Sequence, residues 1–158
     1  MSRILARFTI VLLGYAAATL AASAFLNLLA LGALGLAPEE TPFVVAGPMF
    51  VSVPVVALFI GYFAFFPSVV AILLGEIIGR RDWLLHAIAG GCISAVVVWL
   101  FWYASMPQSE FDGLELELHL IFAVIGSGMV GGIAYWLVAG RSAGIWREDS
   151  ISPGPSGS

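Results

Sequence analysis

Four long apolar runs constrain the fold more than any other feature of this sequence. They extend over Phe8–Leu36, Phe43–Ile78, Trp83–Met106 and Leu114–Ala139. About 20 apolar residues in a helix cross the roughly 30 Å hydrocarbon layer of a membrane, and each run is long enough to do so. A helix also satisfies its backbone hydrogen bonds internally, as lipid requires. The runs therefore predict an all-α integral membrane protein, a bundle of four transmembrane helices.

Composition supports the membrane class and excludes several others. The chain is 61% hydrophobic and only 10% charged, whereas about 25% of a soluble domain is charged. A soluble domain of this size has too much surface to be covered by so few charges. The single cysteine, Cys92, rules out a disulfide scaffold, and we expect it to be a small packing residue inside the third run.

The polar breaks set the domain organisation. We expect one membrane domain over residues 1–149, followed by a disordered cytoplasmic tail over residues 150–158, which is rich in Ser, Gly and Pro. Within the domain the predicted helices lie at about 8–36, 48–78, 83–106 and 113–139.

The arginines predict the orientation. All six basic residues are arginines, and they precede the first run, separate the second from the third, and follow the fourth: Arg3, Arg7, Arg80, Arg81, Arg141 and Arg147. With four crossings these three places share one side, and the other two loops carry only acidic charges. Because arginine-rich loops stay in the cytoplasm, both termini are predicted to be cytoplasmic.

The N-terminus allows a second interpretation. Arg3, Arg7, an apolar stretch and Ala22-Ser23-Ala24 are also typical of a signal peptide, which would be cleaved after about residue 24. The apolar run continues without a break to Leu36, which favours a retained helix. Both interpretations give the same topology for the rest of the chain.

The second run is longer than one straight crossing and contains Pro48, Pro54 and Pro67. Because proline removes an amide donor and bends a helix, we expect helix two to be kinked, with residues 43–58 tilted or lying at the outer interface. An aromatic group then falls in its outer half, as an interfacial belt. Its members are Phe59, Tyr62, Phe63, Phe65 and Phe66.

Glycines with a spacing of four predict close helix packing. Small residues let helix backbones approach each other in lipid. The favoured interpretation is packing within the bundle; self-association or docking on a partner helix is the alternative. The glycines concerned are Gly75 and Gly79 on helix two and Gly128, Gly132, Gly140 and Gly144 on and after helix four.

Four ionisable residues come to the same depth near the inner face: Glu76, Arg80, Arg81 and His86. Ionisable groups at membrane depth are functional candidates. Glu76 and Arg80 can also pair at i, i+4 while reaching towards the water. The cluster is thus either a snorkelling ion pair or a site for an anionic lipid head group or a partner.

No motif indicates catalysis or a cofactor. Glu115 and His119 share one face of helix four at i, i+4 beside Glu117, but a third strong metal ligand is missing, so we expect a solvated helix start and no metal. Asp112 with Glu115 fits a capping box there. No cofactor and no nucleic-acid partner is expected.

One local pattern resembles a known group. The stretch Tyr135–Gly144, YWLVAGRSAG, is similar to the end of the last helix in small uncharacterised four-helix inner-membrane proteins of alphaproteobacterial type. The resemblance covers about a tenth of the chain. It implies a multi-pass protein of the bacterial inner (plasma) membrane and no particular activity.

Packing signals outnumber catalytic ones, so the sequence favours a structural or accessory subunit, not an enzyme. Its expected partners are the lipid bilayer and either a second copy of the chain or another membrane protein. The alternative is a small transporter or channel component, with helices two and four lining the path. A third hypothesis is a lipid-head-group-binding or lipid-modifying protein that uses Glu76 and His86.

Overall fold

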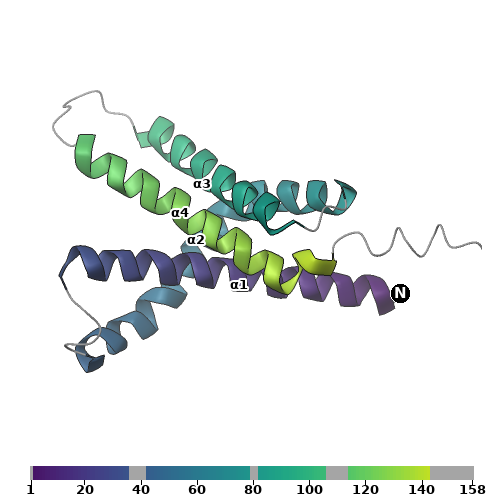
Figure 1. Ribbon diagram of the computed structural model, residues 1–158, viewed down its shortest axis with the longest axis horizontal. Coiled ribbons are helices and arrows are strands. Elements are labelled where there is room, and N and C mark those ends of the chain that lie inside the picture. The colour runs from purple at the N-terminus through teal and green to yellow at the C-terminus, as the bar shows by residue number, and fades with distance from the viewer. Residues whose placement is uncertain (1, 36–41, 79–81, 106–113, 143–158) are drawn as a thin grey trace, which may run out of the picture.

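A computed structural model describes residues 2–35, 42–78, 82–105 and 114–142. These ranges hold no strand and contain four long helices followed by a short 3₁₀ turn, η1 (Figure 1). Each long helix is apolar and long enough to cross a membrane, which confirms the predicted all-α bundle. The elements are α1 (Ser2–Ala33), α2 (Pro42–Ile78), α3 (Trp83–Ser105), α4 (Leu114–Val138) and η1 (Gly140–Ser142). The predicted tail, 150–158, lies outside the described residues.

Two helices begin earlier than predicted. α1 starts at Ser2 and α2 at Pro42. A proline fits the first turn of a helix, where its missing amide hydrogen has no helical partner to lose. α1 ends where Gly35 adopts a φ of 70° and the Leu34 amide donates to the Ala30 carbonyl at 3.1 Å. A glycine in the left-handed conformation is a common helix stop.

α4 lies at the centre of the bundle, packed along both α3 and α1, whereas α2 packs mainly on α1. In Figure 1 the start of α1, the end of α2, the start of α3 and the end of α4 lie at one end of the bundle, here named the proximal end. The opposite end, named the distal end, holds the end of α1 and the start of α4. This arrangement is the one that four successive crossings produce.

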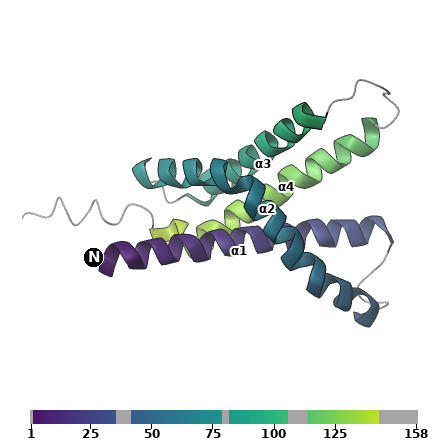
Figure 2. The same ribbon diagram turned by 180° about the vertical axis from the view of Figure 1, so that it is seen from behind.

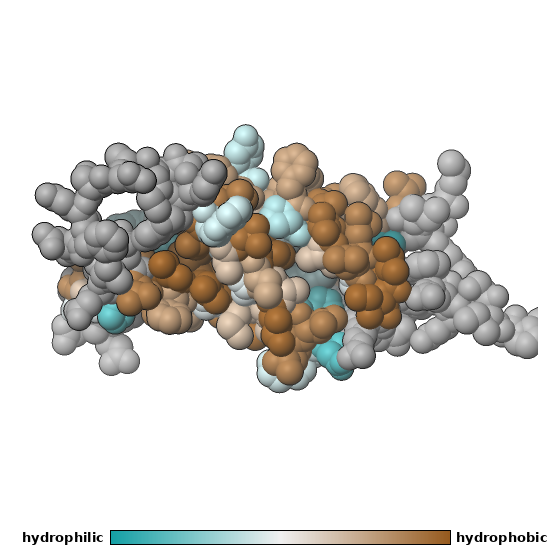
Figure 3. All heavy atoms as spheres, turned by 90° about the horizontal axis from the view of Figure 1, so that it is seen from above, coloured by the Kyte–Doolittle hydropathy of each residue, from teal (hydrophilic) through white to brown (hydrophobic). Residues whose placement is uncertain are grey.

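The interior is made of small residues and the exterior of large ones. Ala22, Ser23, Ala87, Ser127 and Ala139 are buried, while many leucine, isoleucine and phenylalanine side chains are exposed. Hydrophobic residues accordingly cover much of the coloured surface in Figure 3. In lipid an exposed apolar side chain has no penalty, and small residues bring helices together.

α2 changes direction along its length, as Figure 2 shows. It remains one continuous helix and contains Pro48, Pro54 and Pro67 in its interior. That proline causes the change of direction stays a prediction. Residues 43–58 belong to this helix, and two of them, Ser52 and Val53, are hydrogen-bonded to α1; that this part is tilted or lies at the outer interface stays a prediction.

Candidate functional site

Backbone-to-backbone contact joins α3 to α4. A Cβ added to Gly90 would overlap the Gly128 carbonyl, and one added to Gly132 would overlap the His86 carbonyl. At Gly128 the added atom would overlap the Ser94 hydroxyl. Only glycine fits at these positions, so the predicted glycines of α4 lie against the backbone of α3.

Similar contacts join α1 to α4. A Cβ on Gly14 would lie 2.8 Å from the Ala139 Cβ, and one on Gly131 would lie 3.0 Å from the Ala18 carbonyl oxygen. Small residues on both helices permit this approach. α1, α3 and α4 therefore form a closely packed three-helix unit.

Polar hydrogen bonds join α2 to α1. The Ser23 hydroxyl, fully buried, donates to the Val53 carbonyl at 2.7 Å, and the Ser52 hydroxyl donates to Asn27 Oδ1 at 2.6 Å. Asn27 Nδ2 donates to the Ser23 carbonyl at 2.9 Å and completes the network. α2 is thus held to α1 by side-chain hydrogen bonds, whereas α4 is held to α1 and α3 by close contacts at glycines.

A third α1–α2 hydrogen bond sets the register of these helices. The Tyr15 hydroxyl donates to the Gly61 carbonyl at 2.5 Å, and a Cβ on Gly61 would lie 3.6 Å from Thr19 Cγ2. Thr19 is midway along the candidate span Leu5–Ala33, and Gly61 is midway along Gly47–Gly75. The centres of the two spans therefore lie side by side.

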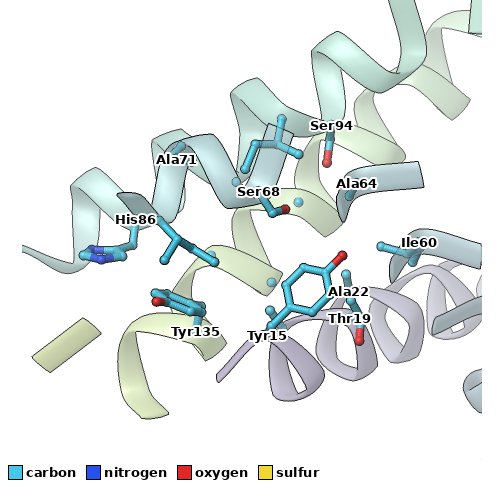
Figure 4. Close-up of a pocket in the computed structure, with 18 of the residues that line it drawn as sticks. Tyr15, Thr19, Ala22, Ile60, Ala64, Ser68, Ala71, His86, Ser94 and Tyr135 are labelled. Carbon is cyan, nitrogen blue, oxygen red and sulfur yellow. The ribbon is translucent and has the colours of Figure 1, made fainter. Parts of the chain in front are cut away.

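A cavity of about 110 Å³ lies between all four helices (Figure 4). α2 contributes a wall of mostly small residues, spaced as one face of a helix: Ile60, Ala64, Ser68, Ala71 and Gly75. The polar groups on the lining are hydroxyls and one imidazole. They belong to Tyr15, Thr19, Ser68, Ser94, His86 and Tyr135.

His86 closes the proximal part of the cavity. A carbonyl oxygen only accepts, so His86 Nδ1–H donates to the Asp82 carbonyl at 2.9 Å. The ring stacks on Tyr135 with centroids 5.9 Å apart and planes inclined by 23° (Figure 4). A Cβ on Gly140 would lie 3.0 Å from His86 Nε2. The sequence placed His86 in a charged cluster; its described contacts are with the Asp82 carbonyl, with Tyr135 of α4 and with Gly140 of η1.

The side chains of the other three residues of that predicted cluster lie outside the described part of the structure. Glu76 lies in α2 with its side chain outside the described residues, and Arg80 and Arg81 lie in the undescribed segment 79–81. Of the remaining predicted packing residues, Gly75 lines the cavity with no atom within 4 Å of an added Cβ. Gly79 and Gly144 also lie outside the described residues.

Other predicted features are placed as follows. His119 is exposed, while Glu115 and Glu117 have undescribed side chains and Asp112 lies outside the described residues. No group of three metal-ligating side chains occurs within the described ranges. Cys92 is exposed on the surface of α3, where the sequence suggested an interior packing residue.

Sequence reasoning missed the α3 partner of the α4 glycines and the hydroxyls of the cavity. Gly90-x-x-x-Ser94 has the small-x-x-x-small spacing that indicates close helix packing, and this signal was available in the sequence. Ser68 and Tyr15 carried no comparable signal, because isolated hydroxyls in apolar runs have no fixed pattern.

The described lining of the cavity contains no carboxylate and no arginine, so its chemistry is that of neutral hydrogen bonding within an apolar space. Comparisons with protein-family models, curated proteins and solved structures give no match to this chain. The function has to be inferred from these contacts alone.

Proposed function

We propose that this is a multi-pass protein of the bacterial inner membrane, with both termini in the cytoplasm, acting as an accessory subunit. In this proposal one face of α2 packs against a helix of another membrane protein. The observation that carries the proposal is an exposed tyrosine hydroxyl, that of Tyr62, at the middle of the membrane-spanning part of α2.

The two faces of the proximal part of α2 differ in size and exposure. The cavity face carries small residues such as Ala64 and Ser68. The opposite face carries Leu58, Tyr62 and Phe66, spaced by four and exposed to 74%, 77% and 80%. This outer face, defined by those three residues, makes α2 the least buried helix, with 6% of its most apolar stretch buried against 17% for α1.

Tyr62 follows Gly61, the residue midway along the candidate span of α2. Its ring contacts Phe63 edge to face with centroids 5.2 Å apart, and among the described residues its hydroxyl has no hydrogen-bond partner. Lipid tails offer no acceptor, so a hydroxyl at this depth loses the hydrogen bonds it makes in water. A carbonyl or hydroxyl on a neighbouring helix supplies an acceptor, and interhelical hydrogen bonds of this kind stabilise helix association in lipid.

The cavity gives less support to the transporter alternative. Its lining residues come from 15–22 of α1, 60–75 of α2, 86–94 of α3 and 128–140 of α4. These segments belong to the proximal and central parts of the bundle. The distal part contributes no described lining residue, so the cavity does not form a path across the bundle.

The experiment is affinity purification of tagged protein from its native membrane in mild detergent. We expect a membrane protein in stoichiometric amount with the wild type, and about fivefold less with Tyr62→Phe, the factor that one neutral hydrogen bond of about 1 kcal/mol provides. Leu74→Ala is the control, because Leu74 is exposed on α2 but lies off the outer face.

Equal recovery in the wild type and Tyr62→Phe, or no stoichiometric partner at all, would contradict the proposal. A second, differently tagged copy of the chain as the recovered partner would show that the partner is the protein itself. Solute flux in liposomes that contain only this protein would favour the transporter alternative instead.

A further inference from the structure

Much of the cavity wall consists of small residues, the type that normally lets helices pack in direct contact. Ala64, Ser68 and Ala71 of α2 and Ala89 of α3 all line it. Small residues of this kind bring α3 and α4 into backbone contact elsewhere in the same bundle. Here they leave a space of about 110 Å³, and an added Cβ on Gly75 meets no atom within 4 Å.

A mostly apolar space of this size, partly open to the surroundings of the bundle, is favourably filled by apolar groups, because the atoms that line it then gain dispersion contacts. It is of the order of the ~150 Å³ engineered cavity that binds benzene. It therefore has room for a small ring or a short segment of hydrocarbon chain.

Two hydroxyls on the lining are available to a ligand. Ser68 and Ser94 make no hydrogen bond to the residues that the structure describes, and Figure 4 shows the Ser68 hydroxyl pointing towards the space between the helices. Each hydroxyl can donate one hydrogen bond. With no described cation or carboxylate beside them, the group that fits them is a neutral acceptor such as a carbonyl oxygen.

A route from the bilayer is provided by α2. This helix packs on α1 but makes few contacts with α3, so little packing has to be lost for the cavity to open between α2 and α3. A molecule that enters there arrives from the hydrocarbon layer and has to be lipophilic.

We infer that the cavity is a binding site for a neutral lipophile that carries a carbonyl oxygen on or next to a hydrocarbon chain. The carbonyl accepts from Ser68 or Ser94, and the chain extends between α2 and α3 into the bilayer. A quinone ring and the ester group of an acyl lipid both have this chemistry. The inference does not depend on the accessory role, because the cavity face and the outer face of α2 point in opposite directions.

The test is photo-crosslinking in proteoliposomes with two probes in separate arms. One probe is a diazirine-tagged short-chain quinone, and the other is phosphatidylcholine with a diazirine on one acyl chain close to the ester. Labelled positions are mapped by mass spectrometry of peptides. We expect one of the two probes to label cavity-lining residues of α2 and α3, and the arm that does so identifies the source of the carbonyl.

Two matched substitutions on α3 separate the cavity from ordinary lipid contact. Ala89 lines the cavity and Ala95 is exposed to lipid. Ala89→Leu fills the space and should remove labelling of the cavity, whereas Ala95→Leu should leave it unchanged. Ser68→Ala should lower it by roughly fivefold, the factor of one neutral hydrogen bond.

Ala71→Leu fills the cavity from the α2 wall and replaces Ala89→Leu if that variant does not fold. Labelling of lipid-exposed positions only, or equal labelling of the cavity in the wild type and the filled variants, would overturn the inference.

Discussion

The substitution Gly132→Ala tests one of the closest backbone contacts in the bundle. The added Cβ would overlap the carbonyl oxygen of His86 and lie 3.2 Å from the Ala87 Cα, both of which belong to the backbone of α3. A side chain could rotate away, but a helix backbone cannot. α3 therefore has to move away from α4, and its whole row of contacts with that helix weakens.

The magnitude follows from two opposing terms. Overpacking of this kind costs about 1–3 kcal/mol, while replacing glycine by alanine inside a helix gains up to about 1 kcal/mol. Gly75→Ala provides the matched control, because it makes the same change inside α2 where no atom lies within 4 Å of the new methyl. The helix term cancels between the two variants, so Gly132→Ala should be less stable than Gly75→Ala by about 1–3 kcal/mol.

The assay is reversible unfolding of the purified protein in mixed micelles, driven by a rising fraction of dodecyl sulfate and followed by the fluorescence of the five tryptophans. The quantity compared is the free energy of unfolding of the two variants under the same conditions. If Gly132→Ala is as stable as Gly75→Ala, the α3–α4 backbone contact does not exist in the membrane and the described packing is wrong.

Three further predictions concern other parts of the chain. Ser23→Ala should lower the free energy of unfolding by about 0.5–1.5 kcal/mol, because the part-buried Val53 carbonyl of α2 loses the hydrogen bond from the Ser23 hydroxyl; an unchanged value would contradict the role of the network. A reporter fused after Arg147 should read as cytoplasmic and one inserted at Glu40 as periplasmic; if both positions were periplasmic, four crossings would be excluded. Arg80→Ala combined with Arg81→Ala should leave co-purifying anionic lipid unchanged in native mass spectrometry, because snorkelling side chains reach water; loss of that lipid would instead indicate a head-group site.

The number of helices could be predicted because it depends on length and apolarity alone. A run such as Trp83–Met106 has to be a helix in lipid whatever its neighbours are. The small-residue pattern of α4 likewise marked Gly128 and Gly132 as positions for close approach. Their partner, Gly90, has the same spacing to Ser94, but one such pair is a weaker signal of close packing than the longer glycine series of α4.

The cavity could not be predicted, because it depends on where helices fail to meet. Ala64 and Ala71 are as small as residues in a tightly packed helix interface, so the sequence does not distinguish the two situations. They line a cavity only because of the position that α2 takes on α1. That position is set by single hydrogen bonds, such as Tyr15 to the Gly61 carbonyl. An isolated hydroxyl in an apolar run has no spacing that reveals its partner.

The two kinds of contact give the helices different roles. Glycine contacts such as Gly90 with Gly128 need the backbones to stay within a narrow distance, so α1, α3 and α4 move together or not at all. The described hydrogen bonds between α2 and α1 lie at separate points, at Ser23, Asn27 and Tyr15, and α2 makes few contacts with α3. The part of α2 from Leu58 to Gly75 carries both the outer face proposed for a partner and the wall of the cavity. A partner helix on the outer face would therefore press the small residues of α2 towards α3, so partner binding and occupancy of the cavity should oppose each other.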